Sequence, residues 1–409
     1  MIAIGIGSPP ELAILALATK YSAPGRDGAR MTGMKFHAGQ AMLSVFVFAT
    51  NAVLAQEPPT PAAPSPTAPG ATQIETWTGP VPETRVPPEY PPFAVADGLE
   101  GWVALSYIVS KDGGVTDLMI EDSSGDESFE HAAAKAVAQW HFAPATRNGE
   151  PIDHPMTRTV LRFTLEKPSE DSADRSSQGA GREFVRAFKQ ISTLVDAGNV
   201  QKAQEALAEL SSEKRRNLYE DAWFWWLRYN VLIAAKTTDR AELLTCLDRA
   251  VGHDVEYLPP DLFLAAAARL VMLRAQDGDF GGALTTYEQL TSSKTAKSAK
   301  DYEHTVGILD ENMQKVRNLI SGPAILQASA LVGRNDYWVH TLTRHSFALS
   351  DIRGDLQAVE VRCQHQSRSY TPVTDQHTWT VPASWEKCGV YIHGTPGATF
   401  KFSEYPDRG

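Results

Sequence analysis

Between residues 102 and 165 the spacing of apolar positions predicts three strands and one helix. The runs 102–110 and 157–165 alternate with period two, and in 102–110 both faces are largely apolar. A shorter strand run lies at 115–120, and residues 129–140 place apolar side chains on one helical stripe. Three strands and one helix can bury a single apolar layer, so this segment predicts a small two-layer α+β domain.

Two local signals mark where these elements meet. Asp112-Gly113 predicts a two-residue hairpin turn after the first strand, because glycine adopts a positive φ at little cost. Asp126 and Ser128 are both candidates for the helix N-cap, since short polar side chains accept hydrogen bonds from the first free backbone N–H groups.

The order of these signals resembles the C-terminal domain of the TonB energy-transducer family. A Tyr-Pro pair opens the segment, an Asp-Gly-Gly turn follows the first strand, and Ser-Ser-Gly precedes the Ala-rich helix. The motif Trp-x-Phe-x-Pro-Ala at 140–145 follows the helix. The resemblance covers residues 86–166 and implies a ββαβ fold.

The resemblance also implies a binding function. Members of this family bind a short extended segment of an outer-membrane transporter, which pairs with the exposed edge of the strand after the helix. Here that strand is 157–165, and we expect Pro substitution at Thr159 or Leu161 to abolish the pairing. We expect the outward side chains of Arg158, Val160 and Arg162 to choose among partners, although a solvated strand face would explain the two arginines equally well. The implied partner-binding residues are Arg158, Thr159, Val160, Leu161, Arg162, Tyr90 and Pro91.

Residues 1–55 predict an export signal. An apolar run at 41–55 follows Lys35 and ends in small residues before Gln56, and it is short for a membrane span. We expect cleavage after Ala55 and a periplasmic protein. The alternative that stays open is an uncleaved, single-span inner-membrane anchor with the rest of the chain on the periplasmic side.

That alternative corresponds to an anchored energy transducer for TonB-dependent outer-membrane transport, with inner-membrane motor proteins as further partners. Energy-transducing members of the family carry a Ser and a His one turn apart in the anchor. Here Ser44 is present, but the residue one turn later is Phe48 instead of His. Within the Pro-rich linker 56–82, the stretch 57–80 reaches only ~75 Å at about 3.1 Å per residue. The sequence therefore favours a periplasmic binding protein.

Two further domains are expected beyond a polar linker at 167–181. Residues 182–322 predict paired helices with turns about every 40 residues, which resemble a degenerate tetratricopeptide-like array. Residues 323–409 contain short β runs separated by turn signals, which favours a small antiparallel sandwich or barrel. With the TonB-like domain at 83–166, the chain is predicted to be a multidomain α+β protein.

Charge and cysteine content narrow the function classes. The formal net charge is −11, and loss of residues 1–55, with four basic and two acidic side chains, would make it −13. This acidity argues against nucleic acid as a partner. Export to an oxidising compartment predicts a disulfide between Cys363 and Cys388, with Cys246 as a buried free thiol.

The sequence carries no catalytic or phosphate-binding motif. We therefore expect no enzymatic activity, no catalytic residue and no cofactor. The two cysteines of the expected disulfide and His365, His377 and His393 could bind zinc, but their spacing matches no known pattern. We also expect a surface position for His340, and a solvated acidic face where Asp and Glu cluster between residues 112 and 130.

Overall fold

The computed structural model describes the chain from residue 76 to residue 407, with short gaps at 125, 166–178, 213–215 and 253–256. The expected export signal and most of the two linkers lie outside these residues. Within the described part of the chain, no helix is both long enough and apolar enough to cross a bilayer.

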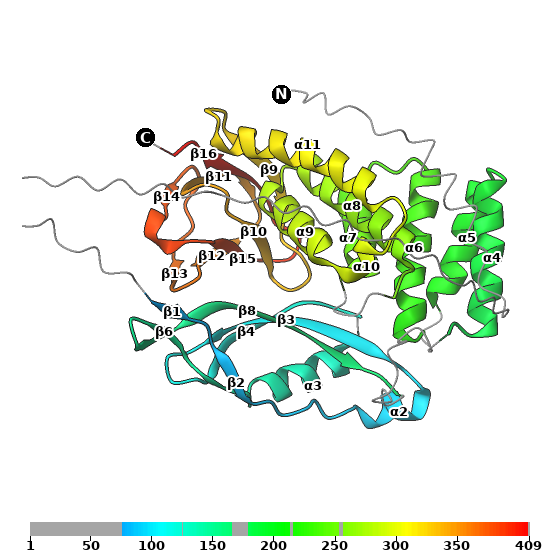
Figure 1. Ribbon diagram of the computed structural model, residues 1–409, viewed down its shortest axis with the longest axis horizontal. Coiled ribbons are helices and arrows are strands. Elements are labelled where there is room, and N and C mark those ends of the chain that lie inside the picture. Colours follow the sequence, from blue (N-terminus) through cyan, green and yellow to red (C-terminus); the bar gives the residue numbers. More distant parts are fainter. Residues whose placement is uncertain (1–75, 125, 166–178, 213–215, 253–256, 408–409) are drawn as a thin grey trace, which may run out of the picture. The chain divides into compact units, whose positions relative to one another are not determined.

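The TonB-like domain is built on a three-stranded antiparallel sheet in the order β4-β3-β8. Helix α3 (Glu127–Val137) covers one face of this sheet (Figure 1). The core between them contains aliphatic residues of β3 and aromatic residues of α3 and β8. The strands are β3 (Gly101–Val109), β4 (Val115–Ser123) and β8 (His154–Phe163).

The turn between β3 and β4 is longer than predicted. It spans residues 110–114, with the Gly113 N–H donating to the Ser110 carbonyl. Gly113 has a φ of 84°, and a Cβ there would lie 2.1 Å from the Phe142 carbonyl oxygen, so glycine is required at this position. Of the two candidate N-caps, the structure selects Asp126, whose side chain accepts from the Ser128 N–H.

Several short elements of this domain have no counterpart in the sequence prediction. They form a β1-β6-β7 sheet, a β2–β5 pair and one short helix. Strands of two to four residues are too short to show a period-two pattern. Their bounds are β1 (Trp77–Thr78), β2 (Val81–Thr84), α2 (Pro92–Asp97), β5 (His141–Ala143), β6 (Ala145–Arg147) and β7 (Glu150–Ile152).

The described residues between 182 and 321 are helical throughout, apart from the connections. The buried side chains of α6 include Trp226 and Tyr229, which stack with ring centroids 5.7 Å apart, and Cys246 is a buried free thiol as expected. The tetratricopeptide-like resemblance stays a prediction. The helices are α4 (Arg182–Asp196), α5 (Val200–Ser212), α6 (Leu218–Ala234), α7 (Arg240–Val251), α8 (Pro260–Gln276), α9 (Phe280–Ser292), α10 (Lys294–Lys297) and α11 (Tyr302–Ser321).

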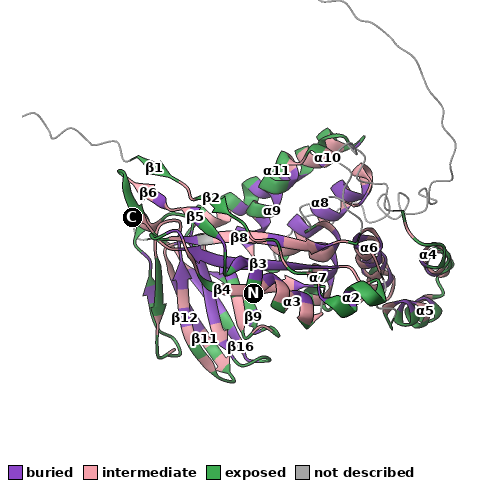
Figure 2. Ribbon diagram, turned by 90° about the horizontal axis from the view of Figure 1, so that it is seen from below, coloured by how far each residue is buried: buried purple, intermediate pink, exposed green. Residues whose placement is uncertain are grey.

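The last part of the chain, called here the β module (residues 326–405), forms two antiparallel sheets in the orders β10-β15-β12-β13 and β14-β11-β16-β9. Apolar residues of both sheets share one buried core. Buried and exposed positions alternate along the strands of the β module (Figure 2). The strands are β9 (Leu326–Leu331), β10 (Tyr337–Thr341), β11 (Ser346–Arg353), β12 (Leu356–Arg362), β13 (Ser367–Tyr370), β14 (Thr378–Thr380), β15 (Gly389–Gly394) and β16 (Thr399–Tyr405).

One expectation about this module is wrong. His340 is buried rather than on the surface: its Nε2 lies 2.9 Å from the Glu404 carboxylate, and its ring stacks on Trp338. The sequence shows no sign of this, because Glu404 lies 64 residues away along the chain.

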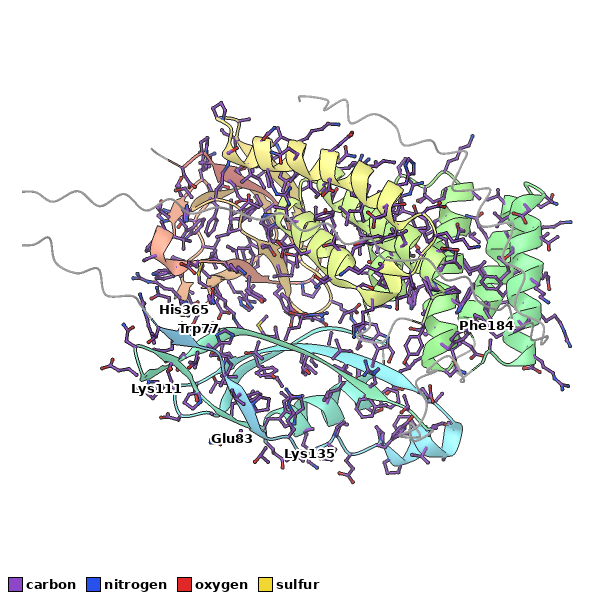
Figure 3. All side chains as sticks on the ribbon, in the orientation of Figure 1. Trp77, Glu83, Lys111, Lys135, Phe184 and His365 are labelled. Atoms are coloured by element: carbon purple, nitrogen blue, oxygen red, sulfur yellow. A yellow bond between two sulfur atoms is a disulfide. The ribbon has the colours of Figure 1, made fainter. Side chains whose placement is uncertain are left out.

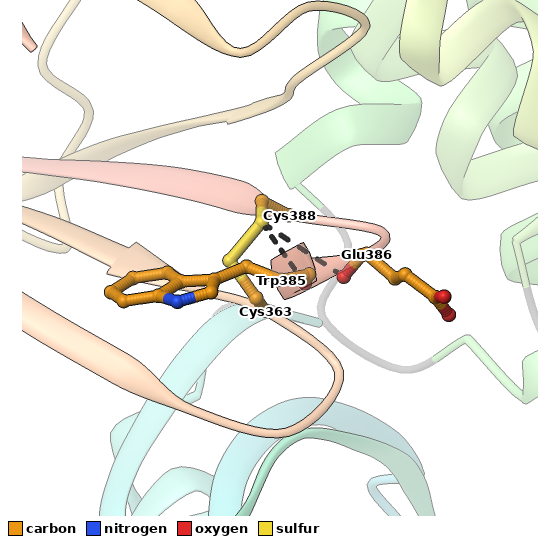
Figure 4. The surroundings of a disulfide bond; sticks show 4 residues. All are labelled: Cys363, Trp385, Glu386 and Cys388. Carbon is orange, nitrogen blue, oxygen red and sulfur yellow. Dashed lines mark hydrogen bonds between the residues drawn. A yellow bond between two sulfur atoms is a disulfide. The ribbon is translucent and has the colours of Figure 1, made fainter. Parts of the chain in front are cut away.

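The structure joins Cys363 and Cys388, which lie just after β12 and just before β15 (Figure 4). The carbonyl oxygens of Trp385 and Glu386 lie 3.5 and 3.9 Å from the Cys388 sulfur. The bridge closes a segment of 25 residues. Replacing both cysteines with alanine is therefore expected to lower the free energy of unfolding by about 3 kcal/mol. Urea titration of the oxidised protein and the double variant checks this, and an unchanged midpoint would contradict it.

Candidate partner interface

Strand β8 lies at an edge of the TonB-like sheet. It pairs with β3, and no other strand in the described part of the chain pairs with it. An edge strand presents backbone N–H and C=O groups that can pair with an added strand. The start of β8 is covered, because the ring of Trp77 packs against His154 and also against His365 from the β module (Figure 3). The accessible part of the edge is therefore its later portion.

The direction of the β8 backbone groups follows from the other side of β3. Trp102 accepts a hydrogen bond from the Ser124 N–H, and its own N–H donates to Ser124 Oγ, so its backbone faces β4. Because backbone groups alternate along a strand, the residues on either side of Trp102 face β8. Val103 lies opposite Leu161, and Leu105, two residues further along β3, lies opposite Thr159. The backbone groups of Leu161 and Thr159 thus point at β3.

It follows that Arg158, Val160 and Arg162 hold the backbone groups that face away from the sheet. This corrects the expectation about proline. Substitution at Thr159 or Leu161 would remove an N–H that bonds β3, and would damage the sheet instead of blocking an added strand.

The side chains of β8 are less exposed than the sequence pattern suggested. Arg158 is exposed, and its Nε lies 2.5 Å from the Glu121 carboxylate. Val160, expected to point outward, is buried on the sheet face opposite α3, where it packs with Trp102 and with Leu218 of α6. Arg162 lies partly buried on the same face. Of the three expected specificity residues, only Arg158 is exposed.

On the α3 side, Thr159 and Leu161 are partly buried, and Leu161 packs against the domain core. Their side chains therefore face the helix side of the sheet.

Tyr90 and Pro91 belong to the interior of the domain. The Tyr90 ring meets Phe129 and Phe163 edge-on, with centroids 5.8 and 5.7 Å away, and its hydroxyl donates to the Leu99 carbonyl. Burial, together with Glu100, raises the pKa of Tyr90 to about 12, so the hydroxyl stays protonated. Pro91 is buried directly before α2. The structure gives both residues a packing role, and we leave them out of the candidate interface.

The acidic cluster is not a solvated face throughout. The Arg249 guanidinium of α7 binds both carboxylate oxygens of Asp122, at 3.0 and 2.7 Å. Arg334, before β10, donates to Glu130 and to Ser123 Oγ at 3.1 and 2.7 Å. Since these arginines lie more than 100 residues from their partners, no local sequence signal could have shown the pairs.

Strand β4, the other edge of the sheet, contacts the β module through its carbonyl groups. The Asn335 side-chain amide donates to the Ile120 and Glu121 carbonyls at 2.8 and 3.1 Å. The Tyr337 hydroxyl donates to the Ile120 carbonyl at 3.0 Å, and Arg362 donates to the Asp117 carbonyl at 3.3 Å. The two edges of the sheet thus differ, because side chains of the same protein already bond the β4 edge.

Among the described residues, no group of three or more His, Cys, Asp or Glu side chains is placed to hold a metal ion. The two cysteines of the considered zinc set are bonded to each other. What the TonB-like domain offers is a strand edge with outward backbone groups. In recognition by strand addition, a partner segment pairs with an edge of this kind.

Comparison with known proteins finds a family match over the TonB-like domain. Residues 86–165 match the family model described as Gram-negative bacterial TonB protein C-terminal, which confirms the resemblance for this domain. Protein tonB2 of Pseudomonas aeruginosa is 41% identical over 66 residues, and Protein TonB of Xanthomonas campestris pv. campestris is 39% identical over 64 residues. Each match covers 16% of this chain, and the chain spans only 24% and 29% of those proteins' lengths.

A solved structure gives a similar but weaker match. The solution structure of the Pseudomonas aeruginosa TonB C-terminal domain is 24% identical and covers 22% of this chain and 92% of that chain. Its TM-score of 0.19 is too low to support an inference.

Proposed function

We propose that this protein takes part in TonB-dependent transport across the outer membrane by binding an extended segment of a transporter. The segment adds to the β8 edge as a new strand, and no chemical reaction is involved. The observation that carries the proposal is the position of β8 at the edge of the sheet, where among the described strands it pairs with β3 alone. Backbone hydrogen bonds supply the affinity in this mode of recognition.

The domain organisation belongs to the same proposal. A signal at 1–55 is removed after Ala55, a Pro-rich linker extends to residue 82, and the TonB-like domain at 83–166 acts in the periplasm. After the linker at 167–181 come a tetratricopeptide-like helical domain at 182–322 and a β domain at 323–409. The retained anchor of an energy transducer is the competing arrangement.

Peptide binding tests the proposed partner. Synthetic peptides that correspond to the extended N-terminal segments of the host's outer-membrane transporters are labelled and titrated with residues 56–409. We expect at least one to bind saturably in fluorescence anisotropy, and a peptide of the same composition in scrambled order to bind at least tenfold more weakly. Saturable binding of none of them would overturn the proposed partner.

Fractionation of the native protein, with intact mass of the recovered chain, separates the two arrangements. A soluble periplasmic chain that begins at Gln56 supports the binding protein. A membrane-embedded chain that retains residues 41–55 supports the anchored transducer instead.

A further inference from the structure

The β4 edge holds backbone groups that the TonB-like sheet does not use. Asp122 and Met119 pair with β3 residues that face β4, so the carbonyls of the two residues between them, Ile120 and Glu121, point away from β3. A register shift marks the extra residue as a β-bulge. An edge of this kind can template pairing with another chain unless something covers it.

Side chains of the β module occupy these carbonyls. Asn335 spans both of them with one amide group, and Tyr337 donates to the first. Burial raises the pKa of Tyr337 well above its ordinary value, with Glu121 adding to the effect, so its hydroxyl remains a donor at any physiological pH. The sequence alone could not link Asn335 and Tyr337 to β4, since they lie more than 200 positions away from it along the chain.

Charge pairs hold the same surface together. Arg334 precedes Asn335 and binds Glu130, and it also lies 3.9 Å from Asp122. Asp122 in turn takes the bidentate contact from Arg249 of the helical region. The turn that carries Asn335 is thus drawn to β4 by opposite charge as well as by hydrogen bonds.

We propose that Arg334, Asn335 and Tyr337, called here the β4 cap, prevent the TonB-like sheet from pairing through β4 with a second copy of this chain. The cap leaves β8 as the edge at which a strand is added. The role of β8 rests on the proposed function, but the cap can be tested without any partner segment. Failure of the peptide experiment and failure of the cap are therefore distinguishable.

The test uses one cap variant and one matched control. The cap variant carries Arg334→Glu, Asn335→Ala and Tyr337→Phe, which removes the donors and sets a carboxylate against Glu130. Arg368→Glu, an exposed residue of β13, makes the same charge change away from β4. Sedimentation velocity over a concentration series is expected to show self-association of the cap variant at concentrations at least tenfold lower than for wild type and control.

Hydrogen exchange by mass spectrometry supplies the second readout. We expect faster exchange in peptides covering 333–337 of the cap variant. If exchange is faster but the cap variant sediments like wild type, the proposal is overturned, because the turn would then open without causing self-association. Unchanged exchange would also overturn it, since the three side chains would then not hold the turn.

A fourth substitution identifies the edge that pairs. Arg158→Pro removes an outward N–H of β8 and leaves β4 intact. Dimers of the cap variant that persist with Arg158→Pro support pairing through β4. Dimers that dissociate on adding Arg158→Pro would show that β8 pairs with itself, and the β4 cap would then have no such role.

Discussion

A chain carrying Arg158→Pro is expected to fold and to lose at least tenfold in affinity for a partner segment, whereas Thr159→Pro is expected to destabilise the TonB-like domain. The two residues are adjacent, but their N–H groups point in opposite directions. Proline at 158 deletes a donor that faces away from the sheet, which edge strands tolerate. Proline at 159 deletes a donor to β3 and leaves a buried carbonyl without a partner, a loss of about 2–3 kcal/mol.

Arg158→Ala is the matched control for this pair. It removes the ion pair with Glu121 but keeps the backbone N–H. Because a half-exposed ion pair contributes little, about 0–1 kcal/mol, Arg158→Ala should bind almost as wild type does. Peptide titration gives the affinities, and urea unfolding gives the stabilities. Equal loss of binding for Arg158→Ala and Arg158→Pro would mean that the side chain, not the strand edge, recognises the partner.

The elements that sequence analysis predicted are those set by neighbouring residues. The period-two runs, the Asp126 cap and the positive φ at Gly113 each depend on a few adjacent positions, and the structure shows all three. The disulfide also followed from local reasoning, because the β domain offered only two cysteines in an exported context. The resemblance to the family predicted the order of the strands and the helix in the TonB-like domain.

What could not be predicted depends on residues distant in sequence. The period of 157–165 showed that its side chains alternate, but not which face the rest of the chain would cover, so Val160 was wrongly expected to point outward. The direction of the backbone groups needed the register against β3 and the Ser124 contact. The arginines that neutralise Asp122 and Glu130 belong to other parts of the chain, and an acidic cluster seen alone gives no indication of them.

The junction between α11 and the β module depends on one buried arginine. Arg344, in the turn between β10 and β11, donates to three carbonyls around the end of α11, those of Leu319, Ile320 and Gly322, at 2.8, 2.8 and 2.9 Å. It also reaches the carbonyl of Ala324 at 2.6 Å. The last carbonyls of a helix have no partner within the helix, so this side chain caps α11.

Arg344→Ala is expected to lower the free energy of unfolding by about 3–5 kcal/mol, because several carbonyls lose their hydrogen-bond donor and the buried Glu404 carboxylate loses its electrostatic interaction with the guanidinium. Burial lowers the pKa of Arg344, opposed by Glu404 and Asp407, but a guanidinium remains charged at neutral pH. Urea titration followed by tryptophan fluorescence measures the loss.

Two further variants show whether the number of donors is the cause. Arg344→Lys keeps the charge but has three donors on a single nitrogen, so it cannot reach all of these carbonyls and should recover less than half of the loss. Arg353→Ala removes an exposed arginine of β11 and should leave stability within about 0.5 kcal/mol of wild type. Full recovery by lysine would show that the charge beside Glu404 matters and that capping of α11 does not.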